Sequence, residues 1–186
     1  MPKKKNTVRF RKFTQQEKNH CRKAGIQKDL KKALQKKSGI KSSVINKALL
    51  CSPNFIGCYA ENEVDSLCFG ALPCFLIVNL DSSNMSGSHW IAIGIFRYKI
   101  EIFDSLGFDI LNWPRVPNKL LIFLRKMTIS KRIRISKRFQ SSESTICGLY
   151  AIFYAKYRAF FNFSFLQSLF TSNLNANDSF IIKLFQ

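Results

Sequence analysis

The chain has 186 residues, of which 46% are hydrophobic and 13% aromatic, and this is enough apolar material for the core of one domain. Its formal net charge is +19, which indicates an anionic partner, with nucleic acid ahead of an anionic membrane. The apolar runs at residues 74–80 and 91–96 are far shorter than the ~20 apolar residues of a membrane helix, so we expect no transmembrane span.

The basic charge is concentrated near the N-terminus. Residues 1–50 contain 16 Lys and Arg residues against two acidic residues, which leaves a net charge of +14. We expect residues 3–12 to form a flexible basic arm. Thr14 to Glu17 then has the form of a capping box, which predicts the start of a basic helix that runs to about Lys37.

We divide the chain into two parts. Residues 1–45 are the basic N-terminal arm and helix, with nucleic-acid binding or nuclear targeting as their role, and residues 46–186 are the main domain. Residues 41–50 are a second short helix or a linker into that domain. A second basic stretch, without any acidic residue, covers positions 119–138. The candidate nucleic-acid-binding residues of both stretches are Lys3, Lys4, Lys5, Arg9, Arg11, Lys12, Arg132 and Arg134.

Beyond residue 50 the chain alternates short apolar runs with turns. The runs expected to form strands, rich in Ile, Val and Phe, are 73–80, 89–96, 98–104 and 132–136. The segments expected to form helices are 118–127 and 147–160. Residues 171–178 are polar and rich in Asn and Ser, and we expect a loop there. The pattern predicts an α+β fold, in which a small mixed sheet packs on a helix headed by Cys147.

The six cysteines are expected to be free thiols. The first five residues lack the apolar stretch of a secretory signal, so nothing marks the protein for an oxidising compartment. The chain contains no Cys-x-x-Cys pair and only two histidines, so the usual structural zinc patterns cannot be written. We therefore expect no metal and no organic cofactor.

The scarcity of histidine narrows the search for a general base, because that role near neutral pH falls most often to histidine. The chain has only His20 and His89. His20 lies among lysines and arginines, as is typical of the solvated face of a basic helix. His89 follows a Ser-Gly-Ser segment and opens an apolar run, where a side chain is both rigidly held and accessible. We take His89 as the candidate base.

The next apolar run ends in a carboxylate, Asp104. A hairpin that turns at Phe96-Arg97 would place His89 directly opposite Asp104, with Cβ atoms about 4.5–5.5 Å apart. A register shift of one residue would instead put the two groups on opposite faces of the sheet. In the predicted register the carboxylate orients one imidazole nitrogen and leaves the other for a nucleophile.

Cys147 is the candidate nucleophile. It follows a polar loop and opens an apolar helical run, and the positive end of a helix dipole stabilises a thiolate. Gly148 allows close approach of a substrate backbone. Gln140, seven residues upstream, and the amide of Cys147 supply two donors for an oxyanion. The alternative role, a buried structural cysteine on an apolar helix, is the commoner one and fits the other five cysteines well.

The chain resembles the adenovirus-type, or adenain-like, cysteine endopeptidases in an ordered set of segments. These are Gly87-Ser88-His89-Trp90, Ile102-Phe103-Asp104-Ser105-Leu106-Gly107-Phe108, Gln140 and Cys147-Gly148-Leu149. Pro53-Asn54-Phe55-Ile56-Gly57 resembles a segment that lines the substrate cleft in this family. The resemblance covers roughly residues 50–160. Such proteases occur in adenoviruses, adintoviruses and virus-like Polinton/Maverick DNA transposons, where they process virion precursor proteins.

The resemblance implies a papain-like or adenain-like α+β fold, with residues 46–186 as a cysteine protease domain. The residues that match the catalytic motif are Cys147 as nucleophile, His89 as base, Asp104 as the acid that orients it, and Gln140 in the oxyanion hole. The residues that match the substrate cleft are Gly57, Trp90 and Gly148. The resemblance also implies capsid or core precursor proteins as substrates, and DNA as a partner and activator. The expected protein is a monomer in the nucleus of a host cell or in the virion.

Two features depart from the adenoviral pattern. The acid is Asp104 where the adenoviral enzymes carry Glu, and Asp is usual in proteases of ubiquitin-like modifiers. The adenoviral enzyme also joins a peptide cofactor through a disulfide to a cysteine between acid and nucleophile. No cysteine lies between Cys74 and Cys147 here, which argues against a disulfide-linked peptide cofactor. Two alternatives stay open: an isopeptidase or protease for ubiquitin-like modifiers, and a non-enzymatic basic nucleic-acid-binding packaging protein.

Overall fold

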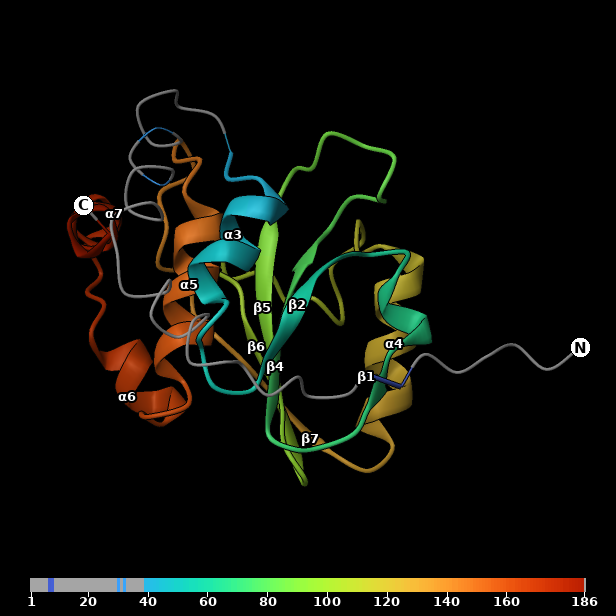
Figure 1. The fold of residues 1–186 in the computed structure, drawn as a ribbon. Helices are drawn as coiled ribbons and strands as arrows, with labels where there is room; N and C mark the ends of the chain where they lie inside the picture. Colours follow the sequence, from blue (N-terminus) through green and yellow to red (C-terminus); the bar gives the residue numbers. More distant parts are fainter. Residues whose placement is uncertain (1–6, 9–29, 31, 33–38, 186) are drawn as a thin grey trace, which may run out of the picture.

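The computed structural model describes residues 7–8, 30, 32 and 39–185 (Figure 1). Its strands are β1 (Thr7–Val8), β2 (Phe55–Ala60), β3 (Cys68–Phe69), β4 (Cys74–Asn79), β5 (Trp90–Ile95), β6 (Lys99–Phe103) and β7 (Arg132–Ile135). Its helices are α3 (Ser42–Leu49), η1 (Val64–Ser66, a 3-10 turn), α4 (Asn118–Thr128), α5 (Cys147–Tyr157), α6 (Phe163–Ser168) and α7 (Leu174–Leu184). Within these described ranges no helix combines the length and the apolar character needed to span a membrane.

Five strands form one mixed sheet in the order β2-β4-β5-β6-β7. β2 runs parallel to β4 and β6 runs parallel to β7, whereas the two central pairings, β4 with β5 and β5 with β6, are antiparallel. A separate parallel pair joins β1 to β3. Each of the four runs predicted to be a strand forms one, and the predicted α+β fold class with a small mixed sheet is confirmed.

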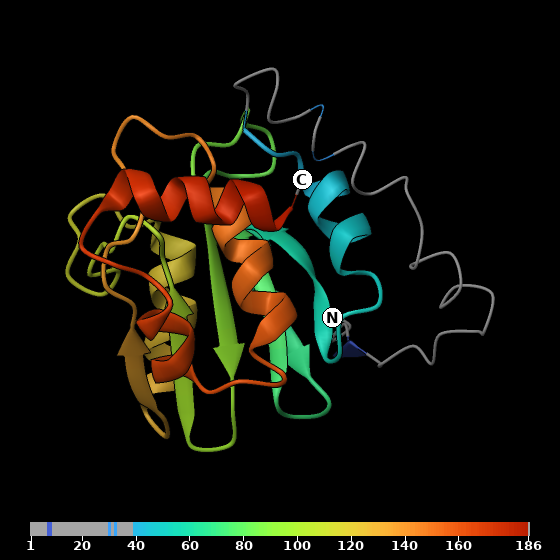
Figure 2. The ribbon, with the colours of Figure 1, turned by 90° about the vertical axis from the view of Figure 1, so that its left-hand side faces the viewer.

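The sheet is covered on both faces. Successive side chains of a strand point to opposite faces. In β4, Phe75 and Ile77 accordingly pack with α3, α5 and α7, while Leu76 and Val78 pack with α4. Figure 1 shows α3, α5, α6 and α7 on one side of the sheet and α4 on the other, and Figure 2 views the sheet from the side of α5. Burial on both faces explains why β4 is apolar along almost its whole length.

The register of the β5–β6 hairpin differs from the predicted one. Ile95 pairs with Ile100, so the turn centres on Arg97-Tyr98, and the prediction of a turn at Phe96-Arg97 is wrong by a shift of two residues in the pairing. Because side chains alternate with a period of two, this shift leaves each residue on its predicted face. His89 and Asp104 therefore keep a common side of the sheet, although they are not directly opposed.

The position of that turn depends on a side chain far along the chain. Lys131, the residue just before β7, donates hydrogen bonds from Nζ to the carbonyl oxygens of Phe96 (2.9 Å) and Arg97 (2.6 Å). The amide of Phe96 in turn donates to the carbonyl of Lys99 (2.9 Å). No Gly or Asn marks the turn locally, and these contacts with a distant side chain stabilise it where it forms.

Helix α5 runs through the core, and all residues from Cys147 to Ala155 are buried. A helix that is apolar all round needs such surroundings. The prediction of a helix from Cys147 is confirmed, but α5 ends at Tyr157 rather than at Phe160.

The prediction of a loop over residues 171–178 is wrong, because α7 begins inside it, at Leu174. The side chain of Asn173 accepts a hydrogen bond from the amide of Ala176 and so caps the helix. Two further polar residues of the segment, Asn177 and Asp178, are buried, and both bond to the loop that precedes α5. The polar residues of this segment therefore cap the start of α7 and bond it to a neighbouring loop.

Most of the predicted N-terminal part lies outside the described residues, including the capping box, His20 and all of the basic arm except Thr7–Val8, which form β1. Leu30 and Lys32 are helical, and Leu30 is buried in the same core as Ile40. Residues 42–49 form helix α3, whose Ile45 and Leu49 are fully buried against α5. A domain boundary after residue 45 would fall within this helix.

The expectation of six free thiols is wrong for Cys51, which takes part in a disulfide bond. The free cysteines among the described residues are Cys58, Cys68, Cys74 and Cys147, and Cys21 lies outside the described residues. Whether two cysteines can bridge depends on the separation of their Cβ atoms in the fold, and sequence spacing does not reveal that separation.

Candidate active site

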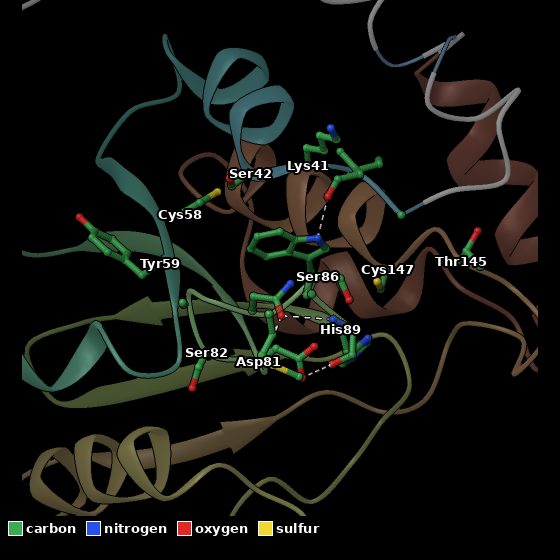
Figure 3. Close-up of a pocket in the computed structure, with 18 of the residues that line it drawn as sticks. Lys41, Ser42, Cys58, Tyr59, Asp81, Ser82, Ser86, His89, Thr145 and Cys147 are labelled. Atoms are coloured by element: carbon green, nitrogen blue, oxygen red, sulfur yellow. Dashed lines mark hydrogen bonds between the residues drawn. The ribbon is translucent and has the colours of Figure 1, made fainter.

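A cleft of about 980 Å³ opens where β5 begins and α5 begins. One wall comes from the segment before α3, another from the end of β2, and the floor from the loop before β5 and the loop before α5. His89, Trp90, Gln140 and Cys147 all line it. Figure 3 shows His89 and Cys147 next to each other in this cleft. Residues far apart in the sequence thus meet at one place.

His89 is fixed between the sheet and a carboxylate. Its carbonyl accepts a hydrogen bond from the amide of Leu80 (2.9 Å), which continues the β4–β5 ladder by one residue. Its ring nitrogen Nε2 lies 2.7 Å from Asp104 Oδ1. Since Nε2 is taken by the carboxylate, Nδ1 is the nitrogen available to face the thiol of Cys147.

Asp104 is held by the turn that follows it. Oδ1 also accepts a hydrogen bond from the amide of Leu106 (2.8 Å), and Oδ2 accepts one from the amide of Phe108 (3.3 Å). The hydroxyl of Ser136 bridges the amide and the carbonyl of Asp104, at 2.8 and 2.7 Å. The carboxylate is fully buried, so its charge is stabilised by these donors and by the imidazole rather than by water.

Gly107 makes the turn around Asp104 possible. Its φ is +69°, a conformation that glycine adopts without strain. A Cβ at this position would also lie 2.6 Å from the backbone nitrogen of Arg138. The turn therefore packs directly on the segment of chain that leads to Gln140, and a side chain at position 107 would force this backbone to shift.

The pKa of His89 reflects its two neighbours. Burial by itself lowers the pKa of the imidazole, but the hydrogen bonds to Asp104 and Cys147, together with the attraction of their negative charges, outweigh burial and raise the pKa to about 9. His89 is therefore charged at neutral pH, and an imidazolium beside a thiol favours the thiolate, which is the reactive form of cysteine.

Cys147 is the first residue of α5. The amide of Cys147 is one of the first amides of the helix, which have no partner within the helix, and the side chain of the N-cap residue, Ile146, makes no hydrogen bond to this turn. Cys147 is buried, with 6% of the residue exposed, and it lies at the positive end of an eleven-residue helix. These surroundings favour a negative charge on an oxygen next to the helix end.

Gln140 is almost completely buried and its amide group is held at both ends. Nε2 donates to the carbonyl of Ser144 (2.6 Å), and Oε1 accepts from the hydroxyl of Ser105 (2.6 Å). Because a carbonyl can only accept, the nitrogen must face Ser144, which settles the orientation of the amide. The second N–H of Nε2 is left as a donor at the cleft that Gln140 lines.

The three predicted cleft residues are placed differently. Trp90 lines the cleft, and its Nε1 donates to the carbonyl of Ile40 (2.8 Å). Gly148 lies beneath this contact, where a Cβ would be 3.1 Å from Ile40 Cβ and 3.3 Å from Trp90 Cδ1. Gly57 is not among the lining residues, but the two residues that follow it, Cys58 and Tyr59, are.

Of the eight predicted nucleic-acid-binding residues, only Arg132 and Arg134 are described; Lys3, Lys4, Lys5, Arg9, Arg11 and Lys12 lie outside the described ranges. Both arginines are exposed on β7, at an edge of the sheet. Arg134 donates to Ser164 Oγ (2.9 Å) and stacks over the ring of Phe163. Arg132 pairs with Lys99 at the end of the sheet remote from His89.

Sequence reasoning missed several residues that hold the site together. Ser105 and Ser136 bond to Gln140 and Asp104, the carbonyl of Ile40 accepts from Trp90, and Asn177 and Asp178 of α7 bond to the loop of Gln140. Ser105 directly follows the predicted acid, Asp104, in the sequence, and this adjacency is the one local signal. The other contacts join segments far apart in the chain. In the described part of the chain, no group of three or more His, Cys, Asp or Glu side chains is placed to hold a metal ion.

Comparison with known proteins adds little to this geometry. No protein-family model matches the chain. No curated protein sequence matches it either. A solved structure of the SUMO protease Ulp1, with its catalytic cysteine oxidised to a sulfenic acid, is similar at 13% sequence identity and a TM-score of 0.40, over 94% of this chain and 95% of that one. At this identity and TM-score the likeness says nothing about the chemistry of the site.

Proposed function

We propose that this protein is a cysteine endopeptidase of the adenain-like type, with Cys147 as nucleophile. The observation that carries the proposal is a chain of contacts: Asp104 bonds to His89, and His89 bonds to Cys147, the first residue of α5. His89 and Cys147 line a cleft large enough for an extended peptide. A nucleophile in contact with a base, and a base oriented by a third group, is the arrangement that nucleophilic catalysis needs.

The proposed reaction is acyl transfer in two steps. The thiolate of Cys147 attacks the carbonyl carbon of a peptide bond and forms a C–S bond. The resulting oxyanion accepts hydrogen bonds from the amide of Cys147 and from Gln140 Nε2. His89 then gives its proton to the leaving amine as the C–N bond breaks, which leaves a thioester. Water loses a proton to His89 and attacks the thioester, and the C–S bond breaks to release the acid and regenerate Cys147.

Each neighbour of the pair has a role in this scheme. Asp104 keeps Nε2 of His89 occupied, so that Nδ1 faces the sulfur and the reacting groups. The raised pKa of His89, about 9, keeps a proton on the ring for the leaving amine at neutral pH. Burial of Asp104 and His89 keeps water from competing for these hydrogen bonds.

The proposed substrates are virion precursor proteins, cleaved in the nucleus of a host cell or in the virion. This part of the proposal is supported by the order and spacing of the motifs in the sequence, and by the basic charge that would hold the protease on DNA.

Cleavage of a degenerate mixture of quenched fluorescent peptides, followed by mass spectrometry of the products, tests the proposal. We expect the wild-type protein to cut a subset of peptides, and Cys147→Ala and His89→Ala each to abolish cutting without unfolding the protein. Cys68→Ala is the matched control, because Cys68 is a free cysteine on β3 and does not line the cleft. Cleavage by Cys147→Ala at the wild-type rate would refute the proposal.

A second candidate, removal of ubiquitin-like modifiers, is favoured by one observation: the acid beside His89 is an aspartate. The same chemistry would then act on the carbonyl of a C-terminal Gly-Gly. Fluorogenic conjugates of ubiquitin-like proteins distinguish the two candidates, since an endopeptidase for other sequences would leave these conjugates intact while it cuts the peptide mixture. A protein that only binds nucleic acid would cut neither.

A further inference from the structure

We infer that Ser105 is a positioning residue, which holds the side-chain amide of Gln140 in the orientation required for an oxyanion donor. The inference rests on the proposed function and names a residue outside the predicted catalytic set. It starts from a contact between two buried side chains, Ser105 Oγ and Gln140 Oε1, which lie 2.6 Å apart and belong to residues that are each 1% exposed.

The direction of this hydrogen bond follows from the other end of the amide. Gln140 Nε2 faces the carbonyl of Ser144, which can only accept, so Oε1 faces Ser105 and can only accept as well. Ser105 Oγ must therefore be the donor. With Oε1 held by Ser105 and one N–H held by Ser144, rotation about the last side-chain bond is blocked. Because the amide group is planar, these two hydrogen bonds also fix the direction of the second N–H of Nε2.

Ser105 also ties the main chain at the same point. Its carbonyl accepts hydrogen bonds from the amides of Phe139 (2.8 Å) and Gln140 (2.9 Å). Ser105 directly follows Asp104, so one turn of the chain holds two groups of the site. These are the carboxylate that orients His89 and the side chain of Gln140. This explains why the residue beside Asp104 carries a hydroxyl: an apolar side chain would leave Oε1 of Gln140 unpaired in a buried site.

The loop that carries Gln140 has supports of its own. Asn177 Nδ2 donates to the carbonyl of Phe139 (3.1 Å), and the amide of Ser141 donates to Asp178 Oδ2 (3.3 Å). The hydroxyl of Tyr150 donates its one hydrogen to Asp178 Oδ1 (2.8 Å), and its oxygen lies 3.2 Å from the carbonyl oxygen of Phe139. Removing only the hydroxyl of Ser105 keeps these bonds and the two main-chain bonds. The change therefore frees the amide group of Gln140 without displacing its loop.

Loss of this hydrogen bond should affect the step in which the oxyanion forms and no other step. A freed amide spends part of its time in orientations in which no N–H points at the oxyanion, and this loss matters only when the oxyanion forms. Substrate binding and the reactivity of the thiol do not depend on it. We therefore expect Ser105→Ala to lower kcat about threefold to tenfold, the range for one hydrogen bond that orders a donor, with KM unchanged.

A double-mutant cycle tests the inference, with the peptide that the wild-type protein cuts fastest from the degenerate mixture as substrate. The variants are Ser105→Ala, Gln140→Ala and the double variant. Gln140→Ala alone should lower kcat by about 10²–10³. If Ser105 acts through Gln140, the double variant is no slower than Gln140→Ala. Ser105→Thr, which keeps the hydroxyl, should restore kcat toward the wild-type value.

Alkylation of Cys147 by iodoacetamide is the readout that separates positioning from a general structural role. Its rate and pH profile should be the same in wild type and Ser105→Ala, because no oxyanion forms in that reaction. Two results would overturn this inference and leave the proposed function intact. One is a double variant whose fold-loss of kcat equals the product of the two single losses, and the other is slower alkylation of Cys147 in Ser105→Ala. Absence of peptide cleavage by the wild-type protein would overturn the proposed function, and this inference with it.

Discussion

The indole nitrogen of Trp90 donates a 2.8 Å hydrogen bond to the carbonyl of Ile40, fifty residues earlier in the chain. Ile40 is buried in the core beside α5, and Trp90 is the first residue of β5, directly after His89. The contact places the segment before α3 over the head of α5, where that segment forms a wall of the cleft (Figure 3). The wall of the candidate site thus depends on residues that precede the predicted protease domain.

Trp90→Phe should loosen this wall. The ring remains apolar, but the carbonyl of Ile40 loses its donor in a partly buried position, which should cost about 1 kcal/mol of unfolding free energy. Under the proposed function the wall contacts substrate and takes no part in the chemistry, so we expect KM to rise more than kcat falls. Denaturant unfolding and steady-state kinetics on a cleaved peptide measure the two effects. An unchanged KM would mean that the segment at residues 39–43 does not contact the substrate.

Asp104→Asn should leave partial activity with a shifted pH profile. The amide oxygen still accepts from Nε2 of His89, but the variant lacks the carboxylate that helps to raise the pKa of His89 to about 9. The imidazole then loses its proton at a lower pH, so the fall of kcat at alkaline pH should begin earlier than in wild type. Measurement of kcat against pH for both proteins tests this. Superimposable profiles would show that Asp104 does not set the pKa of His89.

Protonation of His89 should also be visible in stability. Because its folded-state pKa of about 9 lies above the usual 6.5, the charged form stabilises the folded protein. That contribution is fully present below pH 6.5 and is lost as pH rises through about 9. The free energy of unfolding should therefore fall more steeply over this interval in wild type than in His89→Gln. Parallel curves for the two proteins would contradict the raised pKa.

The chemistry of the site was open to prediction because its residues are rare and stand at the ends of elements. Only two histidines occur, and only His89 opens an apolar run. The runs that became β4, β5, β6 and β7 are short, apolar and bounded by turns, so their type follows from local pattern. Cys147 could be placed at a helix head because a polar loop precedes a long apolar run. These are all local signals.

Contacts between distant segments could not be predicted in the same way. The β5–β6 register depends on Lys131, and the helical state of Leu174 to Asp178 depends on the cap at Asn173 and on bonds to the loop of Gln140. Polar residues such as these favour a loop by composition alone, and only their partners in the fold make a buried helix the lower-energy choice. The disulfide bond of Cys51 could not be predicted for the same reason, because it depends on which cysteines the fold brings together.

The charge of the N-terminal arm predicts how DNA binding should respond to salt. Replacing Lys3, Lys4, Lys5, Arg9, Arg11 and Lys12 with Gln should flatten the log–log salt slope by up to about 0.9 for each phosphate group that the variant no longer neutralises. Arg132→Gln with Arg134→Gln should have a smaller effect, because Arg134 already bonds to Ser164. Titrations of duplex DNA between about 50 and 200 mM salt measure the slopes. An unchanged slope in the arm variant would show that the arm does not bind DNA.

The measurement that bears most directly on the proposed nucleophile is selective alkylation at a mildly acidic pH of about 6.5, with mass spectrometry of every cysteine. Burial raises the pKa values of Cys58 and Cys74 to about 12, so these thiols should scarcely react. We expect iodoacetamide to modify Cys147 first in the wild-type protein and to lose this selectivity in His89→Ala, while Cys68→Ala behaves as wild type. Modification of Cys147 at the same rate in His89→Ala, or no faster than that of Cys58, would contradict the account.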